Sequence, residues 1–284
     1  MSAPIAMRYS PPRDDLGDKI SALYELTLDG DHFDEVERAD RPQLRILIKG
    51  SGRYHFANGH EDDGSPVTLL GPTSGPVRVI GKGPMLVCGA GLLPPAWMAM
   101  AGEDAESLTD RSIDGVAKLG PSASRLFDAM AAAPTTEARF ALISDFIAEA
   151  SAAGDPTTIE FTRIVDRWLA ESLDPTIETL KAETGLGIRQ IERLIKRYYG
   201  LPPKTLARRY RAIRAASALA RGEDIDALGL GDSFYDQSHL IREVKRFAGL
   251  TPLQMRKGQS TLQTEVSEGL KSLEGQVPPL ISDA

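Results

Sequence analysis

The segment FYDQSHLIREVKRFAGLTP, Phe234 to Pro252, has the pattern of a short amphipathic helix. Asp236 is placed to cap the helix, and Gly249 and Pro252 end the helical pattern. At about 100° per residue the helix has two faces. The apolar face holds Leu240, Ile241, Val244, Phe247 and Ala248, and the polar face holds Ser238, His239, Arg242, Lys245 and Arg246. Three cations on one face, with Glu243 at its flank, favour nucleic-acid contact over a solvated face, which usually mixes both signs.

A second copy of this pattern lies about fifty residues upstream, in GIRQIERLIKRYYGLPPKTL, Gly187 to Leu206. Its apolar arc holds Ile188, Ile191, Leu194, Ile195 and Tyr198, and its polar arc holds Arg189, Glu192, Arg193, Lys196 and Arg197. Each predicted helix follows a short apolar helical stretch, at 179–184 and 225–228, and a turn that contains glycine. This order predicts two helix-turn-helix units, in each of which the second helix enters the major groove.

The Ala- and Arg-rich stretch 206–220 contains no glycine or proline, so it is predicted as a helix that connects the two units. We expect four of its arginines to be exposed, either on phosphates or on a solvated face: Arg208, Arg209, Arg211 and Arg214. Gly229 and Gly231 each cost about 1 kcal/mol in a helix interior. The first helix of the second unit is therefore expected to be short, frayed or completed only on DNA.

The two units resemble the tandem helix-turn-helix domain of the AraC/XylS family of bacterial transcription regulators, closely over Phe234 to Pro252 and more loosely over Gly187 to Leu206. Gly187 replaces the family's common capping Ser or Thr, and Ser233 replaces a turn glycine. The resemblance implies base contacts by Ile188, Arg189, Glu192 and Arg193, and by Gln237, Ser238, His239 and Arg242. The cations farther along both helices, Lys196, Arg197, Lys245 and Arg246, complete the predicted DNA-binding set. Double-stranded DNA is the expected partner, with RNA polymerase and a second copy of the chain as further candidates.

The charge distribution supports the same division. Residues 177–258 hold 16 Lys and Arg against 9 Asp and Glu, whereas the whole chain of 284 residues has a net charge of −7. A basic module attracts phosphates, and the acidic remainder is repelled by them. No apolar run approaches the roughly 20 residues of a membrane helix, and the N-terminus lacks a signal-peptide core, so we expect a cytoplasmic, nucleoid-associated protein.

The N-terminal half is predicted as a small antiparallel β-barrel or sandwich followed by helices, which makes the chain α+β. Short apolar runs between turn residues mark the strands within 20–93: 23–28, 44–48, 53–56, 67–70, 77–80 and 85–88. Sensor domains of the resembled family are often cupin-like barrels, and this stretch is compatible with one. Ala-rich helical segments follow at 96–105, 121–133 and 136–153. Phe140, Ile143, Phe146, Ile147 and Ala150 recur at helical spacing, which fits a dimer seam or, more commonly, core packing.

We therefore expect an effector-sensing and dimerisation domain at 1–155, a linker helix at 156–175, the tandem helix-turn-helix domain at 176–258 and a flexible tail at 259–284. The tail assignment follows from its Ser, Gln, Glu and Pro content.

Other residues that could carry chemistry have simpler interpretations. Cys88, the single cysteine, lies in an apolar stretch and is expected in the core, which argues against the cysteine-rich adaptive-response DNA methyltransferases. His55 and His60, beside an acidic run, suggest a solvated hairpin more than a metal site. The tract 69–76, LLGPTSGP, is interpreted as a pair of turns because it lacks the lysine and helix of a phosphate loop. We expect no catalytic residues, no metal and no cofactor.

Two further hypotheses remain beside a DNA-binding regulator modulated by an effector or partner. One is a small-molecule-binding or catalytic barrel that a DNA module localises, and the other is a protein-interaction module. Trp97, Tyr54 and Phe56 could line an apolar effector pocket, with Arg45 or Arg53 as its polar anchor, although such residues more often fill cores. A carboxylate–histidine constellation or a metal in the barrel would favour catalysis, and a large closed apolar pocket would favour sensing.

Overall fold

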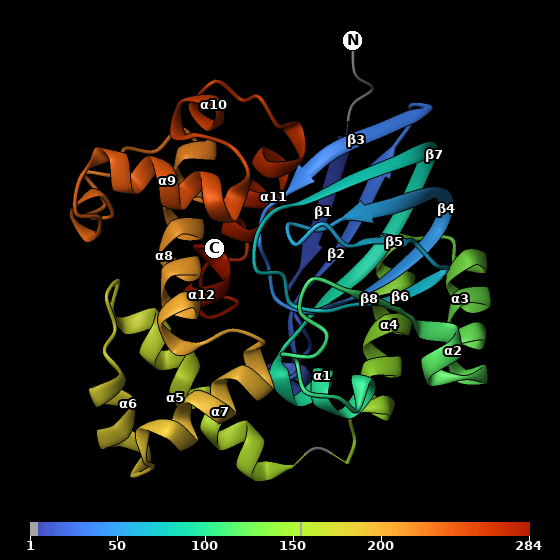
Figure 1. Ribbon diagram of the computed structural model, residues 1–284. Helices are drawn as coiled ribbons and strands as arrows, with labels where there is room; N and C mark the ends of the chain where they lie inside the picture. The colour runs from blue at the N-terminus through green and yellow to red at the C-terminus, as the bar shows by residue number, and fades with distance from the viewer. Residues whose placement is uncertain (1–4, 154) are drawn as a thin grey trace.

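Two long bent strands organise the N-terminal half of the computed structural model, which describes residues 5–153 and 155–284 (Figure 1). The strands are β1 (Ile5–Ser10), β2 (Ile20–Leu28), β3 (His32–Glu37), β4 (Gln43–His55), β5 (Glu61–Asp63), β6 (Val67–Leu70), β7 (Val77–Leu92) and β8 (Ser112–Asp114). All pairs are antiparallel, in the order β1-β2-β7-β4-β6-β8, with β3 on β7 and β5 on β4. Register shifts in β4 near Lys49 accompany the bend of the sheet.

This sheet confirms the predicted antiparallel β-domain and the α+β class. Each predicted apolar run falls in or overlaps a strand, although 44–48 and 53–56 join into β4, and 77–80 and 85–88 join into β7. These runs join because the bulges and glycines between them bend the strand without ending it. The edge strand β1, the charged strand β3 and the short strands β5 and β8 were not predicted.

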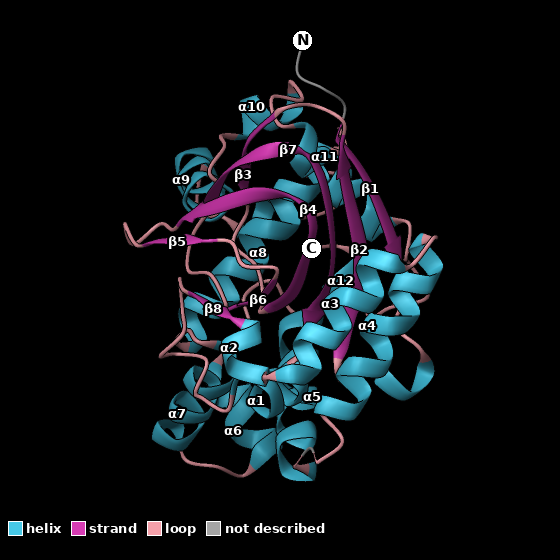
Figure 2. Ribbon diagram, turned by 90° about the vertical axis from the view of Figure 1, so that its right-hand side faces the viewer, coloured by secondary structure: helices cyan, strands magenta, loops and turns pink. Residues whose placement is uncertain are grey.

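Helices cover both faces of the sheet (Figure 2). They are α1 (Pro94–Ala101), α2 (Gly115–Leu119), α3 (Pro121–Ala132), α4 (Thr136–Ala150), α5 (Pro156–Glu171), α6 (Ile177–Thr184), α7 (Ile188–Tyr199), α8 (Pro203–Ala220), α9 (Gln237–Ala248), α10 (Pro252–Arg256), α11 (Thr261–Lys271) and α12 (Pro279–Ser282). One face packs on α1, α3 and α4 around Ile46, Cys88 and Trp97. Phe140, Ile143 and Ile147 of α4 are buried in this core, which favours core packing over a dimer seam.

The C-terminal helices form two smaller cores that share α8. Leu206 and Tyr210 of α8 join the core of α5, α6 and α7, whereas Ile213 and Leu219 join the core of α9 and α10. The predicted linker helix corresponds to α5, which packs on α6 and contributes to the first of these cores. No helix in the described part of the chain is both long and apolar enough to cross a bilayer.

The flexible tail expected at 259–284 is wrong. These residues form α11 and α12, and Leu262, Leu273 and Ile281 are buried. The backbone N–H of Met7 in β1 donates to Glu265 Oε2 at 3.3 Å, so α11 lies against the first strand. The segment is ordered because its few apolar side chains cover the sheet face opposite α1, α3 and α4.

Candidate nucleic-acid interface and effector cavity

The two predicted recognition helices are α7 and α9, and they match position by position. Each has 12 residues and ends at a glycine with positive φ, Gly200 at 76° and Gly249 at 79°. Counted from the first residue of each helix, Arg193 corresponds to Arg242, Lys196 to Lys245 and Arg197 to Arg246. The expected cap is present in α9, where Asp236 Oδ1 accepts from the His239 backbone N–H at 2.6 Å. In α7, Gly187 offers no side chain for this role.

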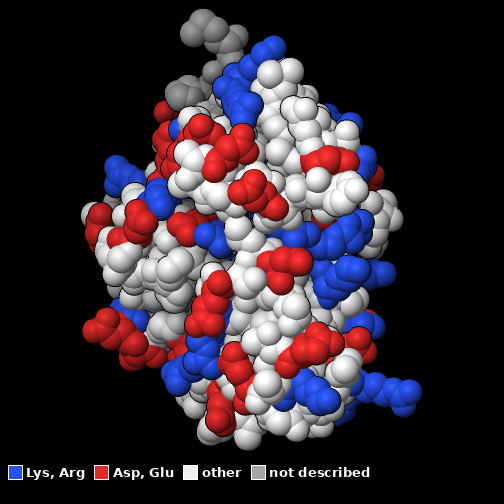
Figure 3. All heavy atoms as spheres, turned by 90° about the vertical axis from the view of Figure 1, so that its left-hand side faces the viewer, with Lys and Arg blue, Asp and Glu red and all other residues white. Residues whose placement is uncertain are grey.

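Most of the predicted DNA-binding residues are exposed. They are Ile188, Arg189, Glu192, Arg193 and Arg197 on α7, and Gln237, Ser238, Arg242, Lys245 and Arg246 on α9. Lys196 and His239 are half-buried, and His239 Nδ1 accepts from the Tyr235 backbone N–H at 3.2 Å. Figure 3 shows basic side chains gathered in several groups on the side of the molecule at the left of Figure 1, with acidic side chains between them.

The connecting helix α8 differs from the prediction, because its arginines point inward. Arg209 and Arg211 are buried, and Arg214 is half-buried in an ion pair with Asp283. Arg208 makes a bidentate pair with Glu243, which is itself buried rather than at the flank of α9. Since α8 is packed between both units and the N-terminal domain, these arginines hold the elements together and are withdrawn from phosphate contact.

The second unit lacks the predicted short helix at 225–228. This stretch forms turns in which Gly229 has a φ of 67° and Leu228 is exposed, followed by a 3₁₀ turn at Gly231–Ser233. Two glycines close together weaken a helix in the way the sequence indicated.

An acidic loop of the N-terminal domain contacts the end of α7. Lys196 Nζ lies 2.9 Å from Glu106 Oε1, and Arg197 Nε lies 3.1 Å from Asp104 Oδ1. The backbone N–H of Ala105 also donates to the Arg197 carbonyl at 2.7 Å. No carboxylate among residues 5–153 and 155–284 forms an ion pair with the corresponding Lys245 and Arg246 of α9.

Of the tract 69–76 predicted as a pair of turns, Leu69 and Leu70 belong to β6, and the segment 71–76 lies between the two units and contacts both. A Cβ atom on Gly200 would lie 2.6 Å from Pro72 Cγ and 2.5 Å from Thr109 Oγ1, and one on Gly249 would lie 3.0 Å from Pro76 Cβ and 2.7 Å from Val36 Cγ1. Arg209 of α8 donates to the Thr73 carbonyl at 3.2 Å and to the Asp40 carbonyl at 3.1 Å. Buried Asp110 orders the segment by accepting from the Ser74 backbone N–H at 2.7 Å. Through this segment the N-terminal domain contacts the ends of both recognition helices.

A cavity of about 120 Å³ lies between the sheet face and α11. Its apolar wall includes Leu26, Phe33, Val79 and Met85 from the sheet, and Leu262 and Val266 from α11. Tyr54 and Arg45 line it as expected, whereas Trp97 and Phe56 are buried in the cores and Arg53 is on the exposed β4–β5 hairpin. The cavity is therefore mostly apolar and has one polar end.

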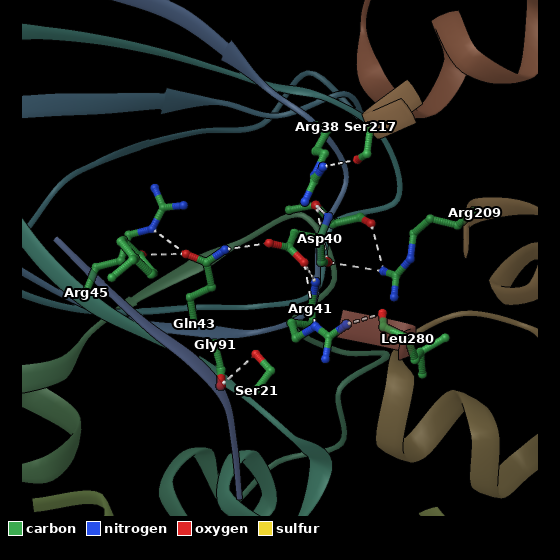
Figure 4. A network of polar contacts seen from close by, with 12 residues as sticks. Ser21, Arg38, Asp40, Arg41, Gln43, Arg45, Gly91, Arg209, Ser217 and Leu280 are labelled. Atoms are coloured by element: carbon green, nitrogen blue, oxygen red, sulfur yellow. Dashed lines mark hydrogen bonds and ion pairs between the residues drawn. The ribbon is translucent and has the colours of Figure 1, made fainter. Parts of the chain in front are cut away.

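The polar end of the cavity lies against the DNA-binding domain (Figure 4). Arg45 is fully paired, with Glu37 through two bonds of 2.9 and 2.6 Å and with Gln43 at 2.9 Å. Gln43 in turn donates to Asp40 Oδ2 at 2.9 Å. Arg38 donates to the Ser217 hydroxyl of α8, and the Ala39 backbone N–H donates to the Phe247 carbonyl of α9 at 2.7 Å.

The remaining candidates have structural roles. His55 pairs with Glu61 and His60 with Asp62 on the β4–β5 hairpin, as the solvated-hairpin interpretation predicts. In the described part of the chain, no group of three His, Cys, Asp or Glu side chains is placed to hold a metal. Cys88 is buried, and this burial raises the pKa of its thiol to about 12.

Comparisons with known proteins identify the C-terminal domain. Residues 180–258 match a family model described as a helix-turn-helix domain. The bifunctional transcriptional activator/DNA repair enzyme Ada of Escherichia coli (strain K12) is 30% identical over 96 residues, which are 34% of this chain. The chain spans only 27% of the length of Ada.

Among solved structures, ToxT from Vibrio cholerae has a TM-score of 0.48 at 9% identity, over 93% of this chain and 99% of that chain. The AraC-like transcriptional activator CuxR has a TM-score of 0.33 at 14% identity, over 79% of this chain and 90% of that chain.

The C-terminal domain of the chain is thus a DNA-binding domain of the helix-turn-helix class. It is an AraC-type tandem domain, which confirms the family resemblance seen in the sequence.

Proposed function

We propose that the chain is a sequence-specific DNA-binding transcription regulator whose N-terminal domain responds to an effector. The observation that carries this proposal is the joint placement of the two recognition helices. Both end on glycines packed against the domain that encloses the cavity. A ligand that moves the cavity wall can therefore change how both helices are presented to DNA.

Two recognition helices joined by α8 suit two successive major grooves on one side of a duplex. The 18 residues of α8 span about 27 Å, against about 34 Å for one turn of DNA. We assign base contacts to Ile188, Arg189, Glu192 and Arg193, and to Gln237, Ser238, His239 and Arg242. We assign phosphate contacts to Lys196, Arg197, Lys245 and Arg246. To make these contacts, Lys196 must break its ion pair with Glu106, and Arg197 must break its ion pair with Asp104.

The cavity favours sensing over catalysis as the role of the N-terminal domain. Its lining holds Glu37 and Asp40 but none of the four histidines, and both carboxylates are engaged with neighbouring polar groups. A largely apolar cavity with one polar end is the usual form of a small-molecule site. Contact with RNA polymerase and formation of a homodimer are further parts of the proposal.

The test is selection of duplexes from a randomised pool by the full chain, followed by anisotropy titration at several salt concentrations. We expect a preferred sequence with two elements about ten base pairs apart and an affinity that falls steeply with salt. The double variant Arg193→Ala/Arg242→Ala should lose the preference, while Arg53→Ala in the distant hairpin should keep it. Absence of binding to any duplex at low salt would overturn the proposal.

A further inference from the structure

The residue just before the second recognition helix is a tyrosine that faces solvent. Tyr235 is 93% exposed, more than any other large apolar side chain of the described residues. Its hydroxyl makes no hydrogen bond within residues 5–153 and 155–284, where the Tyr235 backbone N–H does make one. Folding therefore gains little from this ring, and its presence here calls for a contact outside the chain.

The backbone around Tyr235 is firmly held, so this exposure differs from that of a loose loop. Phe234 is buried, with its ring edge-on to His239 at 5.7 Å between centroids and beneath the guanidinium of Arg211. The Tyr235 N–H donates to His239 Nδ1 at 3.2 Å, and Asp236 Oδ1 accepts from the His239 N–H at 2.6 Å. Tyr235 thus lies between a buried anchor and a helix cap, and its ring is directed away from the protein.

The first recognition helix uses the corresponding position differently. Counted from the cap residues Gly187 and Asp236, Leu186 corresponds to Tyr235. Leu186 is half-buried and packs on the core of α5, α6 and α7. A residue that packs in this way fixes the entry of the chain into the helix. In the second unit the buried residue before the cap is Phe234, so Tyr235 has no such structural role.

Tyr235 lies at the end of α9 that points away from the N-terminal domain (Figure 1), since the other end, at Gly249, packs on Pro76. The exposed run from Tyr235 to Ser238 includes Gln237 and Ser238, to which base contacts are assigned. In helix-turn-helix proteins the N-terminal part of the recognition helix contacts base edges in the major groove. A side chain immediately before that part is therefore placed at the edge of the groove, where the phosphate backbone runs.

We propose that Tyr235 contacts DNA at the edge of the major groove that α9 enters, with its hydroxyl donating to a phosphate oxygen. This contact rests on the proposed function, because it requires that α9 binds a duplex. Tyrosine side chains are among the groups that bond phosphates in protein–DNA complexes, and such bonds position the protein without reading sequence. The first unit has no equivalent, since Leu186 carries no donor.

An uncharged contact has a signature that separates it from the cations of α9. Lys245 and Arg246 would release counterions on binding phosphates, so the loss of either should reduce the slope of log K against log salt by about 0.9. A phenol hydroxyl releases no counterion. Loss of this hydroxyl should therefore weaken binding by the same factor at every salt concentration and for every sequence.

The test is anisotropy titration of the full chain and of Tyr235→Phe with the duplex selected from the randomised pool, at several salt concentrations. We expect Tyr235→Phe to bind about three- to tenfold more weakly at each concentration, the effect of one hydrogen bond, with an unchanged salt slope. Its free energy of unfolding in urea should equal that of the unmodified chain. The control is Leu253→Ala, which removes an exposed apolar side chain from α10, beyond the other end of α9, and should leave the affinity unchanged.

Duplexes that each carry one methylphosphonate identify the phosphate. At the contacted phosphate, the substitution should weaken binding by the unmodified chain and remove its advantage over Tyr235→Phe.

Equal affinity of Tyr235→Phe and the unmodified chain would overturn the contact and leave the proposed function in place. So would a loss of affinity that the methylphosphonates assign to no phosphate. Failure of the unmodified chain to bind any duplex would reject the proposed function, and the contact with it.

Discussion

Arg193 and Arg242 hold equivalent positions in the two recognition helices, and both are exposed. Arginine can pair with guanine through two hydrogen bonds, which discriminates against other bases by about 1–3 kcal/mol. Each arginine is the sixth of the 12 residues of its helix and so lies in the N-terminal half, the half that contacts base edges in helix-turn-helix proteins. We therefore assign to these two residues the sequence preference of the two DNA elements.

We expect Arg193→Ala to relax preference in one DNA element and Arg242→Ala in the other. Each variant removes one arginine–guanine pair, so each should reduce the discrimination at its guanine by about 1–3 kcal/mol. Lys245→Ala should weaken binding to all sequences alike, because it removes a bond to a phosphate. Selection on randomised duplexes measures these effects. Relaxed preference in the same element for both arginine variants would contradict the two-groove arrangement.

Cys88 gives a second prediction at the residue scale. Because burial raises the pKa of its thiol to about 12, Cys88 is protonated throughout the neutral range and forms a thiolate only far above pH 8. We expect it to react with a thiol-specific disulfide reagent at pH 8 only after the chain is unfolded in denaturant. Rapid reaction of the native chain would show that the thiol is accessible and would make Cys88 a candidate redox sensor.

At the scale of elements, the two units differ although their helices match. The cations at the end of α7 are paired with the acidic loop around Asp104 and Glu106, whereas Lys245 and Arg246 at the end of α9 are exposed. The proposed phosphate contacts would therefore require the first unit to break ion pairs with protein carboxylates, whereas the second unit has none to break among the described residues.

Asp104→Asn/Glu106→Gln should accordingly strengthen DNA binding at low salt, because Lys196 and Arg197 become available to phosphates. The slope of log K against log salt should steepen by up to about 0.9 for each cation that binds a phosphate. The control is Glu103→Gln, which removes a charge from the same loop but pairs with Lys118 rather than with α7. If Glu103→Gln changed the DNA affinity equally, the effect would be due to net charge and not to the release of Lys196 and Arg197.

The close packing of Gly200 provides a prediction about the interface between domains. Gly200→Ala adds a methyl group next to Pro72 and Thr109, whereas Gly185→Ala has the same left-handed backbone and nothing within 4 Å. Both variants carry backbone strain, but only the first overpacks an interface. We expect Gly200→Ala to lower the free energy of unfolding by about 1–3 kcal/mol more than Gly185→Ala in urea denaturation. An equal loss of unfolding free energy in the two variants would show that the interface accommodates the added methyl group at little cost.

Local sequence patterns were enough to predict the elements but not their surroundings. The helical periods and glycine stops of 187–200 and 236–249 predicted α7 and α9 almost to the residue, because amphipathicity and caps are encoded locally. The inward arginines of α8 were missed, since their partners, such as the carbonyls of Asp40 and Thr73, are far away in the sequence. The buried arginines at the polar end of the cavity, Arg38 and Arg41, were missed for the same reason, and only the excess of arginine over carboxylate in 37–45 could have suggested them.

At the scale of the whole molecule, α11 connects the parts that the sequence separates. Gln263 Nε2 donates to the Val36 carbonyl of β3 and to the Ala248 carbonyl at the end of α9, both at 2.8 Å, and Gln263 also lines the cavity. One side chain thus touches the sheet, a recognition helix and the proposed ligand space. The sheet, the cavity and the second unit should therefore respond to a perturbation together.

The packing of α11 on β1 also sets an order of events during synthesis. Met7 and Glu265 are 258 positions apart. At about 5–20 residues per second, α11 is therefore synthesised roughly 13 to 50 s after the strand β1 that it covers. Both recognition helices are synthesised within that interval, before α11 is present to close the cavity. We expect stalled nascent chains that expose residues 1–258 to leave the sheet open to protease, and chains that expose residues 1–284 to protect it. Equal protection in both would mean that the sheet folds without α11, so that the proposed ligand space could form before α11 is synthesised.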